Sequence, residues 1–132
     1  MNETLPGNAS ILLLDSDPLT RTVLCERLEK SGYLVVTSPD VGAAVDRLKE
    51  MRPDLLIVRP QISSMPGHMA AEYLRTRCPG LPVLIVGGYM DDERVRVQDA
   101  IKDFHVFPKP FAAEDLLACV RDVLRTVFAK KH

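Results

Sequence analysis

Hydrophobic positions along the chain fall into two alternating patterns: short continuous apolar runs, and longer segments with apolar residues at helical spacing. A short apolar run bounded by turn residues is typical of a strand that is buried on both faces. Apolar residues three or four positions apart predict a helix that covers such a strand on one side. Strands are predicted at Ile11–Asp15, Tyr33–Thr37, Asp54–Val58, Val83–Gly88 and within residues 104–110.

Helices are predicted after these strands, and local signals mark the ends of the first two. Asp17 is expected to cap the first helix, with Pro18 at its first position and Gly32 in a left-handed conformation beyond its end. Ser38 is expected to cap the second helix, followed by Pro39. The apolar stripes consist of Leu19, Val23, Leu24 and Leu28, then Val41, Ala44, Val45 and Leu48, then Met69, Ala70, Tyr73 and Leu74, and in the last helix Leu116, Leu117, Val120, Leu124 and Val127.

Strands that alternate with helices in this way predict an α/β fold, with helices on both faces of a parallel sheet. The fourth helix, over residues 91–103, is polar and only weakly amphipathic. Right-handed crossovers restrict the strand order, and the doubly wound, flavodoxin-like order 2-1-3-4-5 suits five strands. We expect a flexible lead-in over residues 1–9, one domain over residues 10–129 and a tail over residues 130–132.

The composition is that of an ordinary globular protein and argues against several functional classes. Of the 132 residues, 46% are hydrophobic and 27% are charged, and the formal net charge is −1. A nearly neutral chain with 5% aromatic residues and no Trp offers neither the basic surface nor the stacking platform that nucleic-acid binding requires. No apolar stretch approaches the ~20 residues of a membrane helix, and no signal peptide is evident. Three widely separated cysteines fit a reducing environment, so a cytoplasmic protein without a membrane partner is expected.

Residues that carry chemistry follow the ends of the predicted strands. They are Asp15, Ser16 and Asp17 after the first strand, Arg59 after the third, Gly87 at the fourth and Lys109 after the fifth. Because the carboxyl ends of parallel strands meet at one edge of the sheet, we expect these residues to form one pocket. Arg59 is unusual there, because a fixed cation is seldom buried without a partner. It is expected to face Asp15 and Lys109; the alternative is a surface position with its stem over apolar neighbours.

The sequence resembles response-regulator receiver domains over roughly residues 10–128, in the motifs ILLLDSDP, PDLLIVRP, SSMPG, PVLIVGG and FPKPF. This resemblance implies a site at which a histidine kinase transfers a phosphoryl group to an aspartate at the end of the third strand. It also implies two acidic residues after the first strand that hold Mg²⁺. A Thr or Ser at the end of the fourth strand and a Lys before Pro would contact the phosphoryl oxygens.

Position by position, the sequence keeps only part of that pattern. Asp15 and Lys109 match the first acidic residue and the lysine, and Met65 and Gly67 match the loop after the third strand. The departures are Ser16 for the second acidic residue, Arg59 for the phosphoacceptor aspartate, Gly87 for the hydroxyl residue, Ser63 for a proline and Val106 for an aromatic residue. A guanidinium cannot serve as the nucleophile of an acyl phosphate, so the sequence predicts an atypical receiver that lacks its phosphoacceptor.

These departures also change the charge of the predicted pocket. Asp15 is its one well-placed carboxylate, beside the cations Arg59 and Lys109, whereas the resemblance implies three carboxylates and a single lysine. Mg²⁺ prefers oxygen ligands that include a carboxylate, so we expect no tightly bound Mg²⁺ and no other cofactor. Arg59 is expected to form an internal ion pair with Asp15 in place of the metal. The favoured role of Asp17 is that of a helix cap.

The leading functional hypothesis is a receiver-like module of a two-component pathway that is not phosphorylated, acts by protein–protein contact and is not an enzyme. Its expected partners are a histidine kinase, an output domain, or a second copy bound through the face from the fourth to the fifth helix. That face carries Tyr89, Met90, Arg94 and Arg96. Two alternatives are a phosphorelay receiver that is phosphorylated at a displaced aspartate, and a small-ligand-binding domain with a flavodoxin-like fold.

Overall fold

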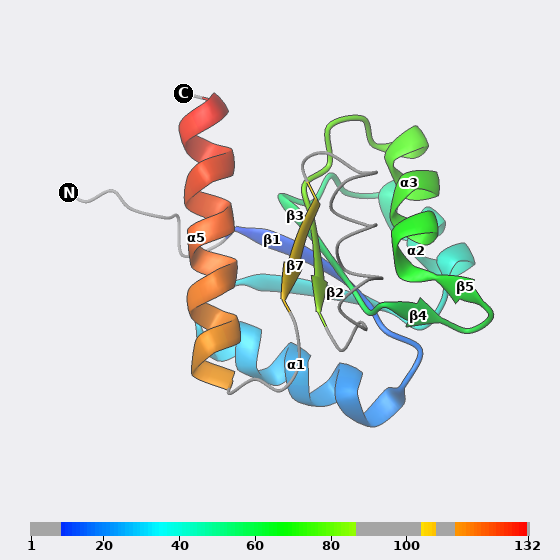
Figure 1. Cartoon of the computed structure of the whole chain (residues 1–132), viewed down its shortest axis with the longest axis horizontal. Helices are drawn as coiled ribbons and strands as arrows, with labels where there is room; N and C mark the ends of the chain where they lie inside the picture. The colour runs from blue at the N-terminus through cyan, green and yellow to red at the C-terminus, as the bar shows by residue number, and fades with distance from the viewer. Residues whose placement is uncertain (1–8, 87–103, 108–112, 132) are drawn as a thin grey trace.

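Five parallel strands form one sheet in the order that the sequence predicts (Figure 1). The structure is a computed structural model, and it describes residues 9–86, 104–107 and 113–131. The strands of this sheet are β1 (Ser10–Leu14), β2 (Leu34–Ser38), β3 (Leu55–Val58), β6 (Val83–Val86) and β7 (Phe104–Phe107). They lie side by side in the order β2-β1-β3-β6-β7, which confirms the predicted α/β fold with its doubly wound sheet.

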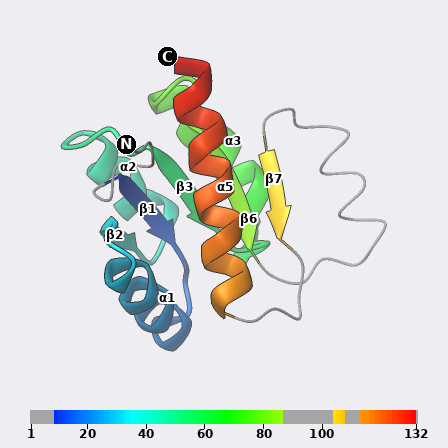
Figure 2. The same ribbon diagram turned by 90° about the vertical axis from the view of Figure 1, so that its left-hand side faces the viewer.

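Helices cover both faces of the sheet. Among the described residues they are α1 (Pro18–Lys30), α2 (Val41–Leu48), α3 (Gly67–Arg77) and α5 (Ala113–Lys131). Figure 2 shows α1 and α5 together on one face, and α2 and α3 lie on the other. In β1, Ile11 and Leu13 pack with α1 and α5, whereas Leu12 and Leu14 pack with α2 and α3. Continuous apolar runs are therefore required in β1, β3 and β6, because each of these strands contributes to two cores.

The predicted ends of α1 are confirmed. Asp17 precedes the helix, and its Oδ2 accepts a 3.0 Å hydrogen bond from the amide of Thr20. Pro18 is the first helical residue, where its missing amide proton costs nothing. Beyond the helix, Gly32 has a φ of 98°, a conformation that glycine adopts without steric cost.

The predicted start of α2 is wrong. Ser38 does not cap this helix, because it is the last residue of β2 and pairs with Leu14 of β1. The cap is Asp40, whose Oδ1 accepts a 2.8 Å hydrogen bond from the amide of Ala43. Pairing with β1 keeps the backbone of Ser38 extended, so the chain turns two residues later and Asp40 is the side chain that reaches the free amides.

Only half of the predicted apolar stripe of α1 faces the core. Leu24 and Leu28 are buried, whereas Leu19 is 72% and Val23 is 48% exposed. At 3.6 residues per turn, Leu19 and Leu24 lie about 140° apart around the helix axis, so a single sheet cannot bury both. Helix α1 therefore presents two apolar faces, one in the core and one in solvent.

The other helices bury their stripes to different extents. In α3, Ala70 and Leu74 are buried but Met69 and Tyr73 are largely exposed. The predicted stripes of α2 and α5 are confirmed, since their members are buried or packed against the core: Ala44, Val41, Val45 and Leu48 in α2, and Leu116, Val120, Leu124, Leu117 and Val127 in α5. In the part of the chain that the structure describes, no helix has both the length and the apolar character needed to span a bilayer.

A small hairpin follows β3, where the sequence predicts only a loop. Its strands are β4 (Gln61–Ile62) and β5 (Met65–Pro66), which pair antiparallel. Ser63 and Ser64 form the turn between them, and Ser63 has a φ of 55°. Two-residue strands are too short to produce a recognisable alternation of apolar and polar positions, which explains why the hairpin was not predicted.

Candidate functional site

Asp15 follows β1 and is almost completely buried, with 2% of its surface exposed. Its amide donates a 3.0 Å hydrogen bond to the carbonyl oxygen of Ser38, which ends the neighbouring strand β2. Its own carbonyl oxygen accepts a 2.9 Å hydrogen bond from Nη1 of Arg21 in α1. Both sides of the Asp15 backbone are thus held by the fold, and the residue lies at the carboxyl edge of the sheet.

The two carboxylate oxygens of Asp15 have different surroundings. Oδ1 accepts a 2.9 Å hydrogen bond from the amide of Asp17, whereas Oδ2 is buried without a hydrogen-bond partner among the described residues. Burial raises the pKa of Asp15 above its ordinary value, and this effect outweighs the Asp17 amide and the charge of Arg59, which both lower the pKa. The site thus favours the neutral form of Asp15 more than water does.

Asp17 is exposed and acts as the cap of α1, as predicted. Its Oδ2 accepts hydrogen bonds from both the hydroxyl and the amide of Thr20. These bonds lower the pKa of Asp17, because they stabilise the ionised carboxylate. Ser16, between the two aspartates, is exposed and brings no charge to the pocket.

Arg59 directly follows β3 and is half-buried at the same edge of the sheet. The predicted direct ion pair with Asp15 is not formed. Oδ2 of Asp15 has no hydrogen-bond partner among the described residues, and Oδ1 accepts a hydrogen bond from the amide of Asp17. The charge of Arg59 still acts at longer range, since it lowers the pKa values of both Asp15 and Asp17. A half-exposed guanidinium keeps part of its hydration, so the protein does not force it into a buried pair.

Two of the predicted pocket residues, Gly87 and Lys109, lie outside the described residues. The predicted interaction face with Tyr89, Met90, Arg94 and Arg96 also lies outside them. The structure therefore brings together Asp15, Ser16, Asp17 and Arg59 from the predicted set. Among described residues, no group of three or more His, Cys, Asp and Glu side chains is arranged to hold a metal ion.

Sequence reasoning missed two residues that contact the site. Ser38 is fully buried, its carbonyl oxygen bonds Asp15, and its Oγ has no hydrogen-bond partner among the described residues. Arg21 reaches back from the first turn of α1 to the carbonyl oxygen of Asp15. The predicted pairing of the first two strands was the signal that could have placed Ser38 beside Asp15.

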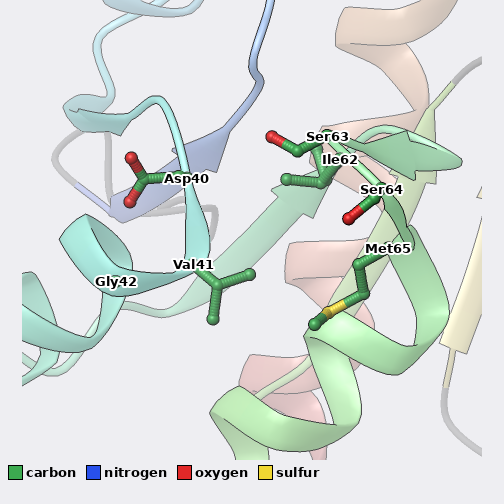
Figure 3. Close-up of a pocket in the computed structure, with 7 residues that line it drawn as sticks. All are labelled: Asp40, Val41, Gly42, Ile62, Ser63, Ser64 and Met65. Atoms are coloured by element: carbon green, nitrogen blue, oxygen red, sulfur yellow. The ribbon is translucent and has the colours of Figure 1, made fainter.

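A hollow of about 260 Å³ lies beside this edge, between the start of α2 and the β4–β5 hairpin (Figure 3). Its lining residues are Asp40, Val41, Gly42, Ile62, Ser63, Ser64 and Met65. Figure 3 shows Val41 on the α2 side and Met65 on the opposite side of the hollow. Asp40 is engaged in capping α2, so the remaining lining consists of apolar side chains and two serines.

Comparisons with known sequences match most of the chain. The sequence model of the response regulator receiver domain matches residues 11–121. The response regulator MprA of Mycobacterium avium (strain 104) is 35% identical over 116 residues, which are 87% of this chain and 50% of that protein. MprA of Mycobacterium sp. (strain KMS) is 34% identical over the same shares. The chain therefore spans about half the length of the curated relatives that it matches.

Solved structures share the fold at lower sequence identity. The chemotaxis protein CheY4 of Vibrio cholerae superposes with a TM-score of 0.78 at 24% identity, covering 88% of this chain and 98% of that chain. NtrX from Brucella abortus superposes with a TM-score of 0.83 at 22% identity, covering 94% of this chain and 29% of that chain. At these identities the similarity establishes the flavodoxin-like architecture alone.

Proposed function

This chain belongs to the response regulator receiver domain family, and we propose that it is a receiver-like signalling module that is not phosphorylated. The observation that carries the proposal is Arg59, the residue that directly follows β3. The resemblance of the chain to receiver domains implies that the phosphoacceptor aspartate would stand at this position. A guanidinium stays protonated at physiological pH and has no lone pair with which to attack phosphorus, so the position cannot form an acyl phosphate.

The surroundings of Asp15 also support the proposal. Phosphoryl transfer relies on a cation to neutralise the charge that develops on the moving group. Among the described residues at this edge of the sheet, Asp15 is the buried acidic residue. Ser16 is neutral, and the carboxylate of Asp17 accepts a hydrogen bond from the amide of Thr20. Since Arg59 adds a positive charge to this region, we expect Mg²⁺ to bind weakly.

A displaced phosphoacceptor is the less favoured alternative. Asp54 precedes β3 rather than following it, and its Oδ2 accepts hydrogen bonds from the amide of Ser10 at 2.9 Å and from its hydroxyl at 3.3 Å. Asp17 is committed to Thr20 in the same way. Hydrogen bonds to Oδ2 draw electron density from the whole carboxylate, so each of these aspartates is a poorer nucleophile than a carboxylate without such bonds.

With no phosphoryl switch at Arg59, the module would signal by binding other proteins. Response regulators interact with histidine kinases and output domains, and we propose partners of these two kinds. A homodimer through the face that includes Tyr89 and Arg94 remains part of the proposal. The domain itself has no expected catalytic role and would depend on a partner to convert binding into an output.

The test is intact-protein mass spectrometry after incubation with Mg²⁺ and a small acyl-phosphate donor. The parent chain, Arg59→Asp and the double variant Arg59→Asp with Ser16→Asp would be compared, with Arg47→Asp as a control for added acidity at an exposed position. We expect no phosphoryl group on the parent or the control, and a gain in one or both Arg59→Asp variants. Phosphorylation of the parent would disprove the proposal, and fragmentation would then identify the acceptor.

A further inference from the structure

Helices α2 and α3 pack side by side on one face of the sheet (Figure 1). A second hollow lies between them. It has a volume of about 200 Å³ and is lined by Val45, Leu48, Lys49 and Arg77. Lys49 is the C-terminal cap of α2, and Arg77 is the last residue of α3. Because crossover helices run antiparallel to the strands, these helix ends lie at the opposite edge of the sheet from Asp15.

The floor of this α2–α3 hollow is apolar and preformed. Val45 and Leu48 are half-buried and pack against the core cluster that contains Ala44 and Leu74. Side chains that are anchored in a close-packed core keep their positions. A ligand that covers Val45 and Leu48 would therefore bury apolar surface without first ordering the protein.

Arg77 is exposed at the rim of the hollow and contacts Tyr73 of the same helix. Its Nη2 donates a 3.0 Å hydrogen bond to the hydroxyl oxygen of Tyr73, and its guanidinium carbon lies 5.4 Å from the centre of the Tyr73 ring. The hydroxyl occupies one of the five guanidinium donors. The other donors are available to a planar carboxylate, and the contact with Tyr73 restricts the guanidinium, which reduces the conformational entropy lost on binding.

Lys49 supplies a second positive charge on the α2 side. Its Nζ lies 3.5 Å from Oδ1 of Asp46, and both side chains are largely exposed. An exposed pair of this kind contributes little energy, so Lys49 can turn to another anion at small cost. Among the residues that the structure describes, no acidic side chain lines the hollow.

We propose that the α2–α3 hollow binds a small apolar carboxylate. One aromatic ring or a short acyl chain would cover Val45 and Leu48, and the carboxylate would bond Arg77 with support from Lys49. Ligand pockets typically measure roughly 300–1,000 Å³. A hollow of about 200 Å³ is smaller, so it limits the ligand to a single ring or a short acyl chain. The inference stands independently of the proposed function, because it concerns neither Arg59 nor phosphorylation.

The test is a titration of the ¹⁵N-labelled chain with benzoate, followed by ¹H–¹⁵N correlation spectra, with benzyl alcohol as the uncharged analogue. We expect saturable shifts centred on Val45, Leu48 and Arg77, with a Kd of about 1 mM, and much weaker binding of benzyl alcohol. Arg77→Met should weaken benzoate binding about tenfold. Arg47→Met removes an exposed cation of α2 that does not line the hollow, and it should leave the affinity unchanged.

Tyr73→Phe provides a second variant that retains the ring and frees the guanidinium from the hydroxyl. It should weaken benzoate binding by less than Arg77→Met does, and spectra of each variant alone would confirm that it is folded. Equal affinities for benzoate and benzyl alcohol, or equal losses in Arg77→Met and Arg47→Met, would overturn the proposal. The absence of saturable shifts up to tens of millimolar benzoate would overturn it as well.

Discussion

Gly67 lies directly against the backbone of Arg59. A Cβ atom on Gly67 would lie 1.9 Å from the carbonyl oxygen of Arg59 and 2.9 Å from its carbonyl carbon. The amide of Gly67 also donates a 2.6 Å hydrogen bond to the carbonyl oxygen of Pro60. The start of α3 is therefore pressed against the end of β3, and the β4–β5 hairpin projects from this junction.

Gly67→Ala should destabilise the fold, because the methyl group would overlap backbone atoms that no side-chain rotation can move. We expect a loss of at least about 2 kcal/mol in the free energy of unfolding, measured by urea denaturation. Gly42→Ala is the matched control, since its Cβ would lie 3.4 Å from Oδ1 of Asp40, an ordinary contact. Alanine is the better helix former, so the control should be neutral or stabilising by up to about 1 kcal/mol. Equal stabilities of the two variants would show that the Gly67 contact relaxes freely.

Much of this fold follows from sequence, because the signals of its strands are local and strong. The strands β3 and β6 are continuous apolar runs, β1 is apolar after Ser10, and the Asp17-Pro18 pair marks a helix start whatever the tertiary structure. From the sequence, Gly67 is only a match to a receiver loop. Its close approach to Arg59 depends on how α3 meets β3, and no local pattern encodes that distance.

The predictions from sequence that were wrong share a physical cause. In each case a tertiary contact competes with a local preference and prevails. Ser38 has the side chain of a good helix cap, but pairing with β1 holds it in β2. Leu19 has helical spacing from Val23, but the sheet covers only one side of α1. The Arg59–Asp15 pair was inferred from opposite charges at one edge, and the amide of Asp17 satisfies one Asp15 oxygen instead.

The two candidate caps of α2 can be separated by mutation. Asp40→Ala should lower the free energy of unfolding by about 1 kcal/mol, because it removes the acceptor of the Ala43 amide, and Asp40→Ser should retain most of that energy. Ser38→Ala should be nearly neutral, since the Ser38 hydroxyl is buried without a described partner. Chemical denaturation of the three variants checks this, and a larger loss in Ser38→Ala than in Asp40→Ala would restore the original prediction.

The two apolar faces of α1 should differ sharply in their contribution to stability. Leu28 is 1% exposed, so Leu28→Ala should cost about 2–5 kcal/mol in the free energy of unfolding. Leu19 is 72% exposed, so Leu19→Ala should change it by no more than about 0.5 kcal/mol. Both variants carry the same chemical change in the same helix. Comparable losses in thermal or urea unfolding would mean that Leu19 packs against the protein in solution.

Asp15 should make the protein less stable as the pH rises. Burial raises its pKa above the ordinary value of 3.8, so the proton is bound more tightly in the folded state than in the unfolded state. The resulting stability is fully present below pH 3.8 and is lost as the pH rises through the folded-state pKa. Asp15→Asn keeps an oxygen for the Asp17 amide but cannot ionise. In urea denaturation it should be more stable than the parent at pH 7, and this advantage should shrink toward pH 4; a less stable Asn variant at pH 7 would contradict the argument.

Removal of the positive charge of Arg59 should raise the pKa of Asp15 further. The guanidinium acts on Asp15 through space without a direct bond, so its field stabilises the carboxylate. Arg59→Met keeps most of the apolar stem, and the pKa can be followed by ¹³C NMR of the Asp15 carboxyl group during a pH titration. Arg47→Met is the control, because Arg47 is not among the charges that act on Asp15. A pKa that is unchanged in Arg59→Met would show that Arg59 is screened by water, and its position after β3 would then have no electrostatic influence on the pocket.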